Sequence, residues 1–249
     1  MAGVMIVTGS SRGIGAATAC LAAERGYDVC INYLTGAAAA ESVLERVRAM
    51  GRRCIAVQAD VASETDIERL FATVDGELGR VSVLVNNAAV VGPGRRRVEA
   101  MRGAAVNALF AANVAGPILC AREAIKRMST RHGGPGGAIV NVSSASARLG
   151  APNLWVDYAA SKGALDTFTI GLAEEIAAEG IRVNGVRPGL IETDLHAATG
   201  MPDRVQKAQR MIPMKRAGTA AEVAECIVWL ASPAASYVSG AILDVAGAR

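Results

Sequence analysis

The chain has 249 residues, of which 51% are hydrophobic and 20% charged, with a formal net charge of +3. This length allows one large buried core, and this balance of apolar and charged residues excludes a disordered chain and a coiled coil. So small a charge predicts no nucleic-acid partner, and we interpret the one basic run, Arg95-Arg96-Arg97, as a solvated loop face.

Short β-branched runs alternate with longer amphipathic stretches almost to the end of the chain, which is typical of a parallel sheet covered by helices on both faces. Strands are expected over residues 4–8, 28–33, 53–59, 81–86, 138–143, 181–187 and 241–245. Helices are expected over 14–25, 37–50, 64–78, 99–131 with an interruption, 157–179 and 219–231. The pattern predicts a doubly wound α/β fold with a seven-stranded parallel sheet, as a single domain over residues 1–249.

Two kinds of segment interrupt this alternation. Residues 91–97 and 132–137 are rich in Gly, Pro or Arg and are expected to be surface loops. Residues 189–218 follow the sixth strand, where an α/β fold usually carries its lid or substrate loop. Ser63 is expected to cap the helix at 64–78, with Asp66 at the third helical position in place of the Glu of a capping box.

The five cysteines, Cys20, Cys30, Cys54, Cys120 and Cys226, are far apart in the sequence and form no C-x-x-C pair. We expect small core residues in a reducing compartment, and no metal site. The N-terminus enters a strand pattern within four residues, and nowhere do 18 apolar residues follow one another. We therefore expect a cytoplasmic protein with no membrane segment.

The glycine-rich run Gly9-x-x-x-Gly13-x-Gly15 lies between the first strand and the first helix. The N-terminus of a helix offers unpaired N–H groups, and glycine lets the backbone approach a pyrophosphate. The absence of Gly-Lys-Ser/Thr argues against a P-loop. The run predicts a dinucleotide site, with a tight strand-to-helix turn alone as the alternative. The expected contact residues here are Gly9, Ser11, Arg12, Gly13, Ile14 and Gly15.

The end of the second strand bears on the choice of dinucleotide. Enzymes that prefer NAD commonly carry an acid there to accept hydrogen bonds from the adenosine ribose, but here the strand ends in Asn32-Tyr33. Arg12 in the glycine loop can meet a 2′-phosphate with its guanidinium fork. NADP(H) is therefore favoured over NAD(H). In the alternative, Arg12 touches only the pyrophosphate or solvent.

Tyr158 and Lys162 are spaced as Y-x-x-x-K. On a helix, positions i and i+4 share a face, so the ammonium can lie beside the phenol. A free tyrosine, with a pKa of about 10, is only about 0.1% ionised at neutral pH. A neighbouring cation that favours the phenolate makes it a usable acid and base.

Together these residues resemble the short-chain dehydrogenase/reductase family over essentially the whole chain. The resemblance rests on Thr8-Gly9-x3-Gly13-x-Gly15, Asp60-Val61, Asn86-Asn87-Ala88, Asn113, Ser143-Ser144, Tyr158-x3-Lys162, and Arg187-Pro188-Gly189 with Ile191 and Thr193. It implies a Rossmann fold and an NADP(H)-dependent oxidoreductase acting on a small carbonyl or alcohol. The nearest resemblances are 3-oxoacyl-[acyl-carrier-protein] reductases and sugar dehydrogenases, and relatives of this kind are commonly homotetramers.

The resemblance also implies catalytic roles. Tyr158 would donate a proton to the carbonyl oxygen that receives hydride at its carbon, and Ser144 would bind the same oxygen. Lys162 would lower the tyrosine pKa and bind the nicotinamide ribose, and Asn113 would hold the water of a proton relay. Ser143 remains the alternative to Ser144, because the span to Tyr158 is longer than in many relatives.

For the cofactor, the resemblance implies that Asp60 binds the adenine amino group and that Val61 packs on the ring. Further contacts are expected from Asn32, Tyr33, Asn87, Ala88, Tyr158, Lys162, Pro188, Gly189, Ile191 and Thr193. Ala89 departs from the family pattern, which has glycine there. If that position needs a positive φ, the methyl group costs on the order of 1 kcal/mol.

The substrate stays open. Residues 145–157, 190–214 and 90–97 are expected to line its pocket, with Trp155, His196 and Met214 as candidate walls, although Trp155 can equally lie in a subunit interface. Trp229-Leu230 and residues 241–245 suggest self-association. A catalytically silent NADP(H)-binding regulator of the same fold is the alternative function.

Overall fold

A parallel seven-stranded sheet forms the centre of the computed structural model, which describes residues 3–92, 94–193, 205 and 209–249. The strand order is β3-β2-β1-β4-β5-β6-β9, and every neighbouring pair is parallel. The strands are β1 (Val4–Val7), β2 (Asp28–Tyr33), β3 (Cys54–Gln58), β4 (Val81–Asn86), β5 (Gly137–Val142), β6 (Ile181–Pro188) and β9 (Ile242–Val245). The doubly wound Rossmann architecture predicted from the sequence is confirmed.

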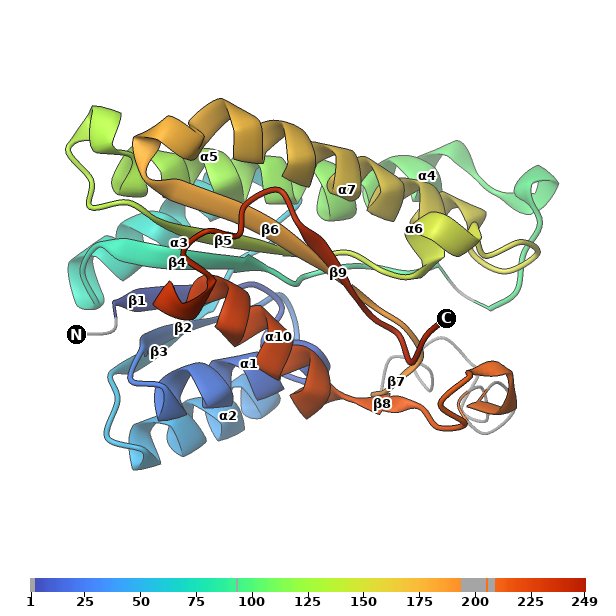
Figure 1. Cartoon of the computed structure of the whole chain (residues 1–249), viewed down its shortest axis with the longest axis horizontal. Helices are drawn as coiled ribbons and strands as arrows, with labels where there is room; N and C mark the ends of the chain where they lie inside the picture. The colour runs from blue at the N-terminus through green and yellow to red at the C-terminus, as the bar shows by residue number, and fades with distance from the viewer. Residues whose placement is uncertain (1–2, 93, 194–204, 206–208) are drawn as a thin grey trace.

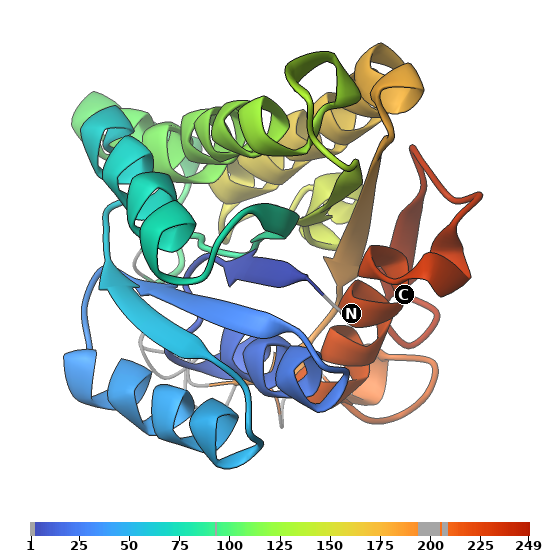
Figure 2. The same cartoon turned by 90° about the vertical axis from the view of Figure 1, so that its left-hand side faces the viewer.

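Helices cover both faces of the sheet (Figures 1 and 2). One layer holds α1 (Gly13–Glu24), α2 (Ala37–Ala49) and α10 (Ala220–Ala231). The opposite layer holds α3 (Glu64–Glu77), α4 (Gly103–Phe110), α5 (Gly116–Met128) and α7 (Val156–Ile176). The end view in Figure 2 shows the sheet between these two layers.

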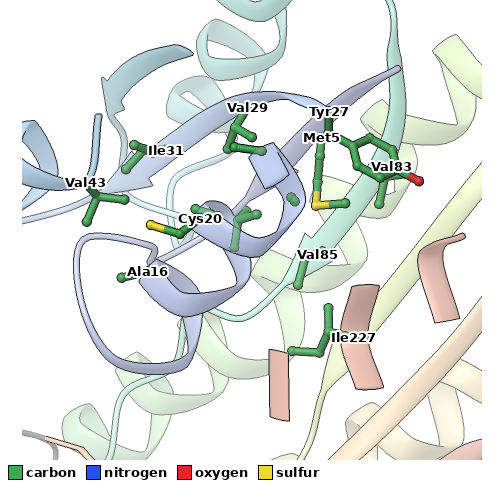
Figure 3. Close-up of a cluster of buried hydrophobic side chains, with 14 of the residues drawn as sticks. Met5, Ala16, Cys20, Tyr27, Val29, Ile31, Val43, Val83, Val85 and Ile227 are labelled. Atoms are coloured by element: carbon green, nitrogen blue, oxygen red, sulfur yellow. The ribbon is translucent and has the colours of Figure 1, made fainter. Parts of the chain in front are cut away.

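The two hydrophobic cores follow from the alternation of side chains along each strand. Met5 and Val7 of β1 belong to the core beneath α1, α2 and α10, whereas Val4 and Ile6 belong to the core beneath α3, α5 and α7. Figure 3 shows the first core, where Ile227 of α10 lies near the strands. Because both faces are buried, the strands are nearly continuous apolar runs, as parallel strands usually are.

All seven predicted strands occur within one residue of their expected ends. The helical region expected at 99–131 is interrupted, as predicted. It consists of η1 (Val98–Ala100), α4, the π-helical turn η2 (Ala111–Ala115), α5 and η3 (Thr130–His132). Several short elements were not predicted: α6 (Ser146–Leu149), η5 (Gln209–Met211), η6 (Pro233–Ala235), and the pair β7 (Ile191–Glu192) and β8 (Gly218–Thr219). The helix predicted over 157–179 ends in a 3₁₀ turn, η4 (Ala177–Glu179). The middle of the expected substrate loop, 194–204 and 206–208, lies outside the described residues.

The predicted cap of α3 forms only in part. The Ser63 hydroxyl accepts a hydrogen bond from the Asp66 amide at 3.3 Å. Asp66 does not return the bond to Ser63; its Oδ2 accepts from the Asp60 amide at 2.8 Å and so fixes the turn after β3. A complete capping box occurs instead at Thr219 and Glu222, at the start of α10.

The helical run Gly103–Met128 is long and apolar enough to cross a membrane by length and composition, with a mean hydropathy of 1.6 and 39% of its most apolar window buried. Core helices of globular proteins meet the same test, and α5 packs against β4 and α3. All five cysteines are free thiols, and four are buried. Burial raises the pKa of Cys54 and Cys120 to about 12, which makes these thiols unreactive.

Candidate functional site

A cavity of about 370 Å³ opens at the carboxyl ends of the strands. The strand order reverses between β1 and β4, and in open α/β sheets this switch point is where ligands bind. All the residues predicted to bind the cofactor line this cavity, as do Ser144, Tyr158 and Lys162 of the predicted catalytic set. Asn113 does not line it. Lining residues that were not predicted to bind the cofactor are Leu34, Thr35, Ala59, Ala89, Val90, Ala112, Val142 and Ser143.

The glycine loop forms a close-fitting cradle on one side of this cavity. Gly9 has a φ of +61°, and a Cβ there would lie 2.8 Å from the Ala88 Cα. At Gly15 a Cβ would lie 2.6 Å from the Asn87 Nδ2. The side chain of Arg12, the N-cap residue, makes no hydrogen bond to the first turn of α1. The N–H groups of that turn therefore remain for a ligand or water. This backbone fits a pyrophosphate, and the geometry supports the dinucleotide prediction.

Two asparagines hold the cradle in place. The Asn87 Nδ2 donates to the carbonyls of Thr8 at 2.8 Å and Gly9 at 3.0 Å. The fully buried Asn32 accepts from the Gly9 amide at 3.2 Å through Oδ1, and its Nδ2 donates to the Ala59 carbonyl at 3.0 Å. These amide groups fix the loop to the strand ends. Asn32 therefore holds the glycine loop in position, a role that the sequence did not suggest.

The predicted adenosine end of the cavity carries one cation, Arg12, and one carboxylate, Asp60. Arg12 is exposed, and β2 ends at Tyr33 and is followed by Leu34 and Thr35, without an acidic side chain. Asp60 is the one carboxylate among the lining residues, and its Oδ1 accepts from the Ala62 amide at 2.8 Å. Ala89 does not adopt a positive φ. The backbone strain that a methyl group would cause at a positive φ therefore does not occur at Ala89.

Tyr158 and Lys162 lie on one face of α7, as their spacing predicted. The Lys162 Nζ is 5.7 Å from the centroid of the Tyr158 ring and donates to the Val142 carbonyl at 2.7 Å. The lysine is only 2% exposed, and burial lowers its pKa to about 8, while the Asp166 carboxylate raises it. This ammonium can therefore exchange its proton close to neutral pH.

The two candidate serines differ in what they bind. The Ser143 hydroxyl is buried and donates to the Lys162 carbonyl at 3.2 Å. The Ser144 oxygen is partly exposed and accepts from the Ser146 amide at 3.1 Å, so its hydrogen can be donated elsewhere. The geometry therefore favours Ser144 over Ser143 as the group that meets a ligand.

Asn113 lies in the π-helical turn η2 and is fully buried. Its Oδ1 accepts from the Val90 amide at 2.8 Å, and its Nδ2 donates to the Val90 carbonyl at 2.9 Å and the Ser161 hydroxyl at 3.1 Å. The side chain thus joins the segment after β4 to α7. The Asn113 amide group is thus engaged with protein groups, and its expected role in holding a water stays a prediction.

A pair of contacts, here called the latch, joins the loop at 91–97 to the start of α7. The Trp155 Nε1 donates to the Gly94 carbonyl at 2.9 Å, and Arg96 forms an ion pair with Asp157. Asp157 also accepts from the Tyr158 amide at 2.9 Å through Oδ1, and the rings of Trp155 and Tyr158 meet edge to face at 6.5 Å. The latch therefore supports the backbone and ring of Tyr158.

The latch corrects two interpretations of the sequence. Arg96 is not solvated as expected, since its side chain is 14% exposed, although Arg95 and Arg97 are exposed. Trp155 is 2% exposed within the single chain, so its side chain offers almost no surface for a subunit interface. Among the other candidate walls, Met214 is 59% exposed, and His196 lies outside the described residues.

Comparisons with known proteins agree with this geometry. The family model described as enoyl-(acyl carrier protein) reductase matches residues 9–247. An uncharacterized oxidoreductase, YgfF, of Escherichia coli strain K12 is 48% identical over 246 residues, covering 99% of each chain.

Two solved structures resemble this one with 32% sequence identity each. A blue fluorescent protein from a metagenomic library, in complex with NADPH, has a TM-score of 0.89 and is matched over 98% of this chain and 96% of its own. A 7α-hydroxysteroid dehydrogenase complexed with NADH and 7-oxo glycochenodeoxycholic acid has a TM-score of 0.90, with 98% and 92% covered. The glycine cradle, the Tyr158–Lys162 pair and these relatives lead to one conclusion: the chain belongs to the short-chain dehydrogenase/reductase family of oxidoreductases.

Proposed function

We propose that the protein is an NADP(H)-dependent oxidoreductase that transfers hydride between the nicotinamide and a carbonyl or secondary alcohol. The observation that carries this proposal is the position of Tyr158, Lys162 and Ser144 on the wall of the cavity that begins at the glycine cradle. The NADPH and NADH complexes of the two structural relatives support a nicotinamide cofactor.

When bound, the cofactor supplies or accepts the hydride at the substrate carbon. Tyr158 donates its phenolic proton to the substrate oxygen in reduction and takes it back in oxidation. The Ser144 hydroxyl donates a hydrogen bond to the same oxygen and holds it within reach of the phenol. Lys162 stabilises the phenolate and binds the nicotinamide ribose, and Asn113 holds the water through which the proton is replaced.

The cofactor contacts follow the cavity from end to end. The first turn of α1 binds the pyrophosphate, Asp60 and Val61 hold the adenine, and Ile191 and Thr193 meet the carboxamide. Arg12 binds the 2′-phosphate of NADP(H), since no carboxylate follows β2 to repel that group.

Replacing Arg12 by alanine is expected to weaken the binding of NADPH much more than the binding of NADH. Loss of one charge-assisted contact to a phosphate corresponds to about 1.5–3 kcal/mol, so the KM for NADPH should rise about 10-fold to 100-fold. The KM for NADH should change little. Steady-state kinetics with both cofactors in wild type and variant measure this, and an equal preference in both proteins would refute the NADP(H) assignment.

Separate alanine variants of the two serines are expected to behave differently. Ser144→Ala should lower kcat by about 100-fold, because a hydrogen bond to the reacting oxygen is lost. Ser143→Ala should keep most of the turnover, since that buried hydroxyl donates to the Lys162 carbonyl and is not directed to a ligand. Turnover lost in Ser143→Ala and kept in Ser144→Ala would reverse the assignment.

The proposed activity itself is tested by following NADPH oxidation at 340 nm, the ordinary absorbance of the reduced cofactor. The panel contains ketones, 3-oxoacyl thioesters, quinones and sugars, because the fold does not choose among them. Saturable NADPH binding without consumption on any member of the panel would contradict the proposal.

We further propose a homotetramer of single-domain chains. Ile118 on α5, Ile170 on α7 and Trp229 on α10 are 39%, 54% and 41% exposed, so both helical layers present large apolar side chains. Light scattering should give four times the 25.5 kDa monomer mass, and a monomer mass would refute this. The five free thiols support a cytoplasmic location.

A further inference from the structure

A chain of four alternating charges lies behind Lys162. Asp166, one helical turn further along α7, accepts a hydrogen bond from the Arg187 Nε through its Oδ2 at 2.8 Å. The Arg187 Nη1 lies 3.8 Å from the Asp244 Oδ1, and the Asp244 Oδ2 lies 3.1 Å from the Arg148 Nη2. These residues come from α7, β6, β9 and α6, so the chain of charges runs from the helix of Tyr158 to the segment that follows Ser144.

The two ends of this chain differ in their exposure to solvent. The side chains of Asp166 and Arg187 are 10% and 18% exposed, whereas those of Asp244 and Arg148 are 40% and 45% exposed. Water and salt screen exposed charges much more than shielded ones. The inner pair therefore carries the electrostatic effect, and the outer pair contributes little to it.

Asp166 is only partly compensated by Arg187. Its second oxygen, Oδ1, is buried without a hydrogen-bond partner among the described residues. A buried carboxylate oxygen without a donor is unusual, because its desolvation is not repaid by a hydrogen bond. The negative charge of Asp166 therefore remains available to act on the ammonium at position i−4 of the same helix, Lys162.

No other described charge has a comparable position beside Lys162. Of the elements that pack against α7, β5, α4 and η2 contain no titratable side chain, whereas β6, α6 and η4 each contain at least one. On β6, Arg187 pairs with Asp166 itself, and Arg182 donates to the carbonyls of Leu230 and Ser232. Arg148 of α6 pairs with Asp244, and Glu179 of η4 accepts from Ser129 and Arg131. On α7 itself, Tyr158 faces the ammonium, and Asp157 is paired with Arg96. Burial lowers the pKa of Lys162 to about 8, and Asp166 is the one charged group that opposes this change.

We propose that Asp166 is a positioning residue for the reaction, whose carboxylate keeps Lys162 protonated beside Tyr158, and that Arg187 sets the strength of this effect. The inference rests on the proposed function, in which the Lys162 ammonium stabilises the Tyr158 phenolate. It adds a third member to the pair: Tyr158, Lys162 and Asp166 occupy positions i, i+4 and i+8 on one face of α7.

The charge of Lys162 can be measured without any turnover. The chain has only four lysines, Lys126, Lys162, Lys207 and Lys215. Labelling with lysine enriched in ¹³C at Cε therefore gives few NMR signals, and Lys162→Met assigns the relevant one. Its chemical shift is followed against pH in wild type, Asp166→Asn, Arg187→Gln and the double variant.

The proposal predicts shifts of opposite sign. Asp166→Asn removes the anion and leaves the Arg187 cation, so the pKa of Lys162 should fall by about 1 or more. Arg187→Gln leaves the anion uncompensated, so this pKa should rise. The double variant removes both charges and should lie between the two single variants. Asp244→Asn, at the solvated end, is the matched control and should leave the pKa unchanged.

Activity gives a second readout. In the oxidation direction the acidic limb of the pH profile of kcat should move to higher pH in Asp166→Asn, and turnover should recover toward wild type at high pH. A purely structural role would lower kcat at every pH and would make the double variant worse than either single one. If Asp166→Asn does not fold, the rise predicted for Arg187→Gln still decides the matter.

Two results would overturn the proposal: an unchanged Lys162 pKa in Asp166→Asn, or a change of the same sign in both single variants. Its failure can be distinguished from failure of the proposed function. If wild type consumes NADPH but the pKa of Lys162 is unchanged in Asp166→Asn, only the proposed role of Asp166 is wrong. If the NMR shifts occur as predicted but no substrate is reduced, the charge coupling stands and hydride transfer is wrong.

Discussion

Tyr158→Phe is expected to lower kcat by about 10²-fold to 10⁴-fold, the range typical of losing a general acid or base. The substitution removes only the hydroxyl, and the ring can keep its edge-to-face contact with Trp155 at 6.5 Å. Cofactor affinity should therefore fall by about tenfold at most, since the loss of one neutral hydrogen bond corresponds to about 0.5–1.5 kcal/mol. Stopped-flow reduction and NADPH fluorescence titration measure the two quantities separately.

Tyr237→Phe is the matched control for this variant. Tyr237 is fully exposed, so the loss of its hydroxyl should leave both kcat and cofactor affinity unchanged. A Tyr158→Phe enzyme that retains wild-type kcat would show that the proton comes from another group. Equal loss of turnover and NADPH binding would show that the phenol holds the cofactor, with no separate role in proton transfer.

Lys162→Met is expected to stabilise the protein without cofactor while it abolishes turnover. Burial lowers the pKa of this lysine from 10.5 to about 8. Keeping the ammonium buried at pH 7 therefore costs about 3 kcal/mol. Methionine fills a similar volume without charge, although the Val142 carbonyl loses its donor, which costs about 1 kcal/mol. The free energy of unfolding should rise by about 2 kcal/mol at pH 7.

The sign of the pH dependence checks this interpretation. Between about pH 8 and 10.5 the unfolded chain binds the lysine proton and the folded protein has lost it, so the wild type gains stability as the pH rises. The advantage of Lys162→Met should be full below pH 8 and nearly gone at pH 10. Urea unfolding at both pH values measures it, and a variant less stable than wild type at pH 7 would contradict the prediction.

Local patterns were enough to predict the sheet and much of the cavity. The strands at 28–33 and 81–86 were predicted to the residue because both faces are buried, which makes them apolar runs between turn residues. The three glycines lie within one strand-to-helix turn, and Tyr158 and Lys162 lie on one helix. Such patterns need only local periodicity, and the fold then brings the carboxyl ends of the strands together.

The contacts that support the catalytic groups could not be predicted in this way. Arg96 and Asp157 are 61 residues apart, and nothing local distinguishes Arg96 from its exposed neighbours. The Asn113 side chain bonds the backbone of Val90, 23 residues away in the sequence. Only the folded structure shows that this side chain is engaged with backbone groups. The Asp166–Arg187 pair spans 21 residues and depends on the register of β6 against α7.

The latch has a consequence for changing the substrate range. Residues 94–96 and 155–157 belong to two segments that the sequence predicts beside the substrate, and they are joined by the Trp155–Gly94 hydrogen bond and the Arg96–Asp157 pair. Grafting either segment alone from a relative would leave a shielded guanidinium or carboxylate without its counterion. The two segments therefore form a single exchangeable unit, and libraries that vary them together should yield more folded proteins than libraries that vary one of them.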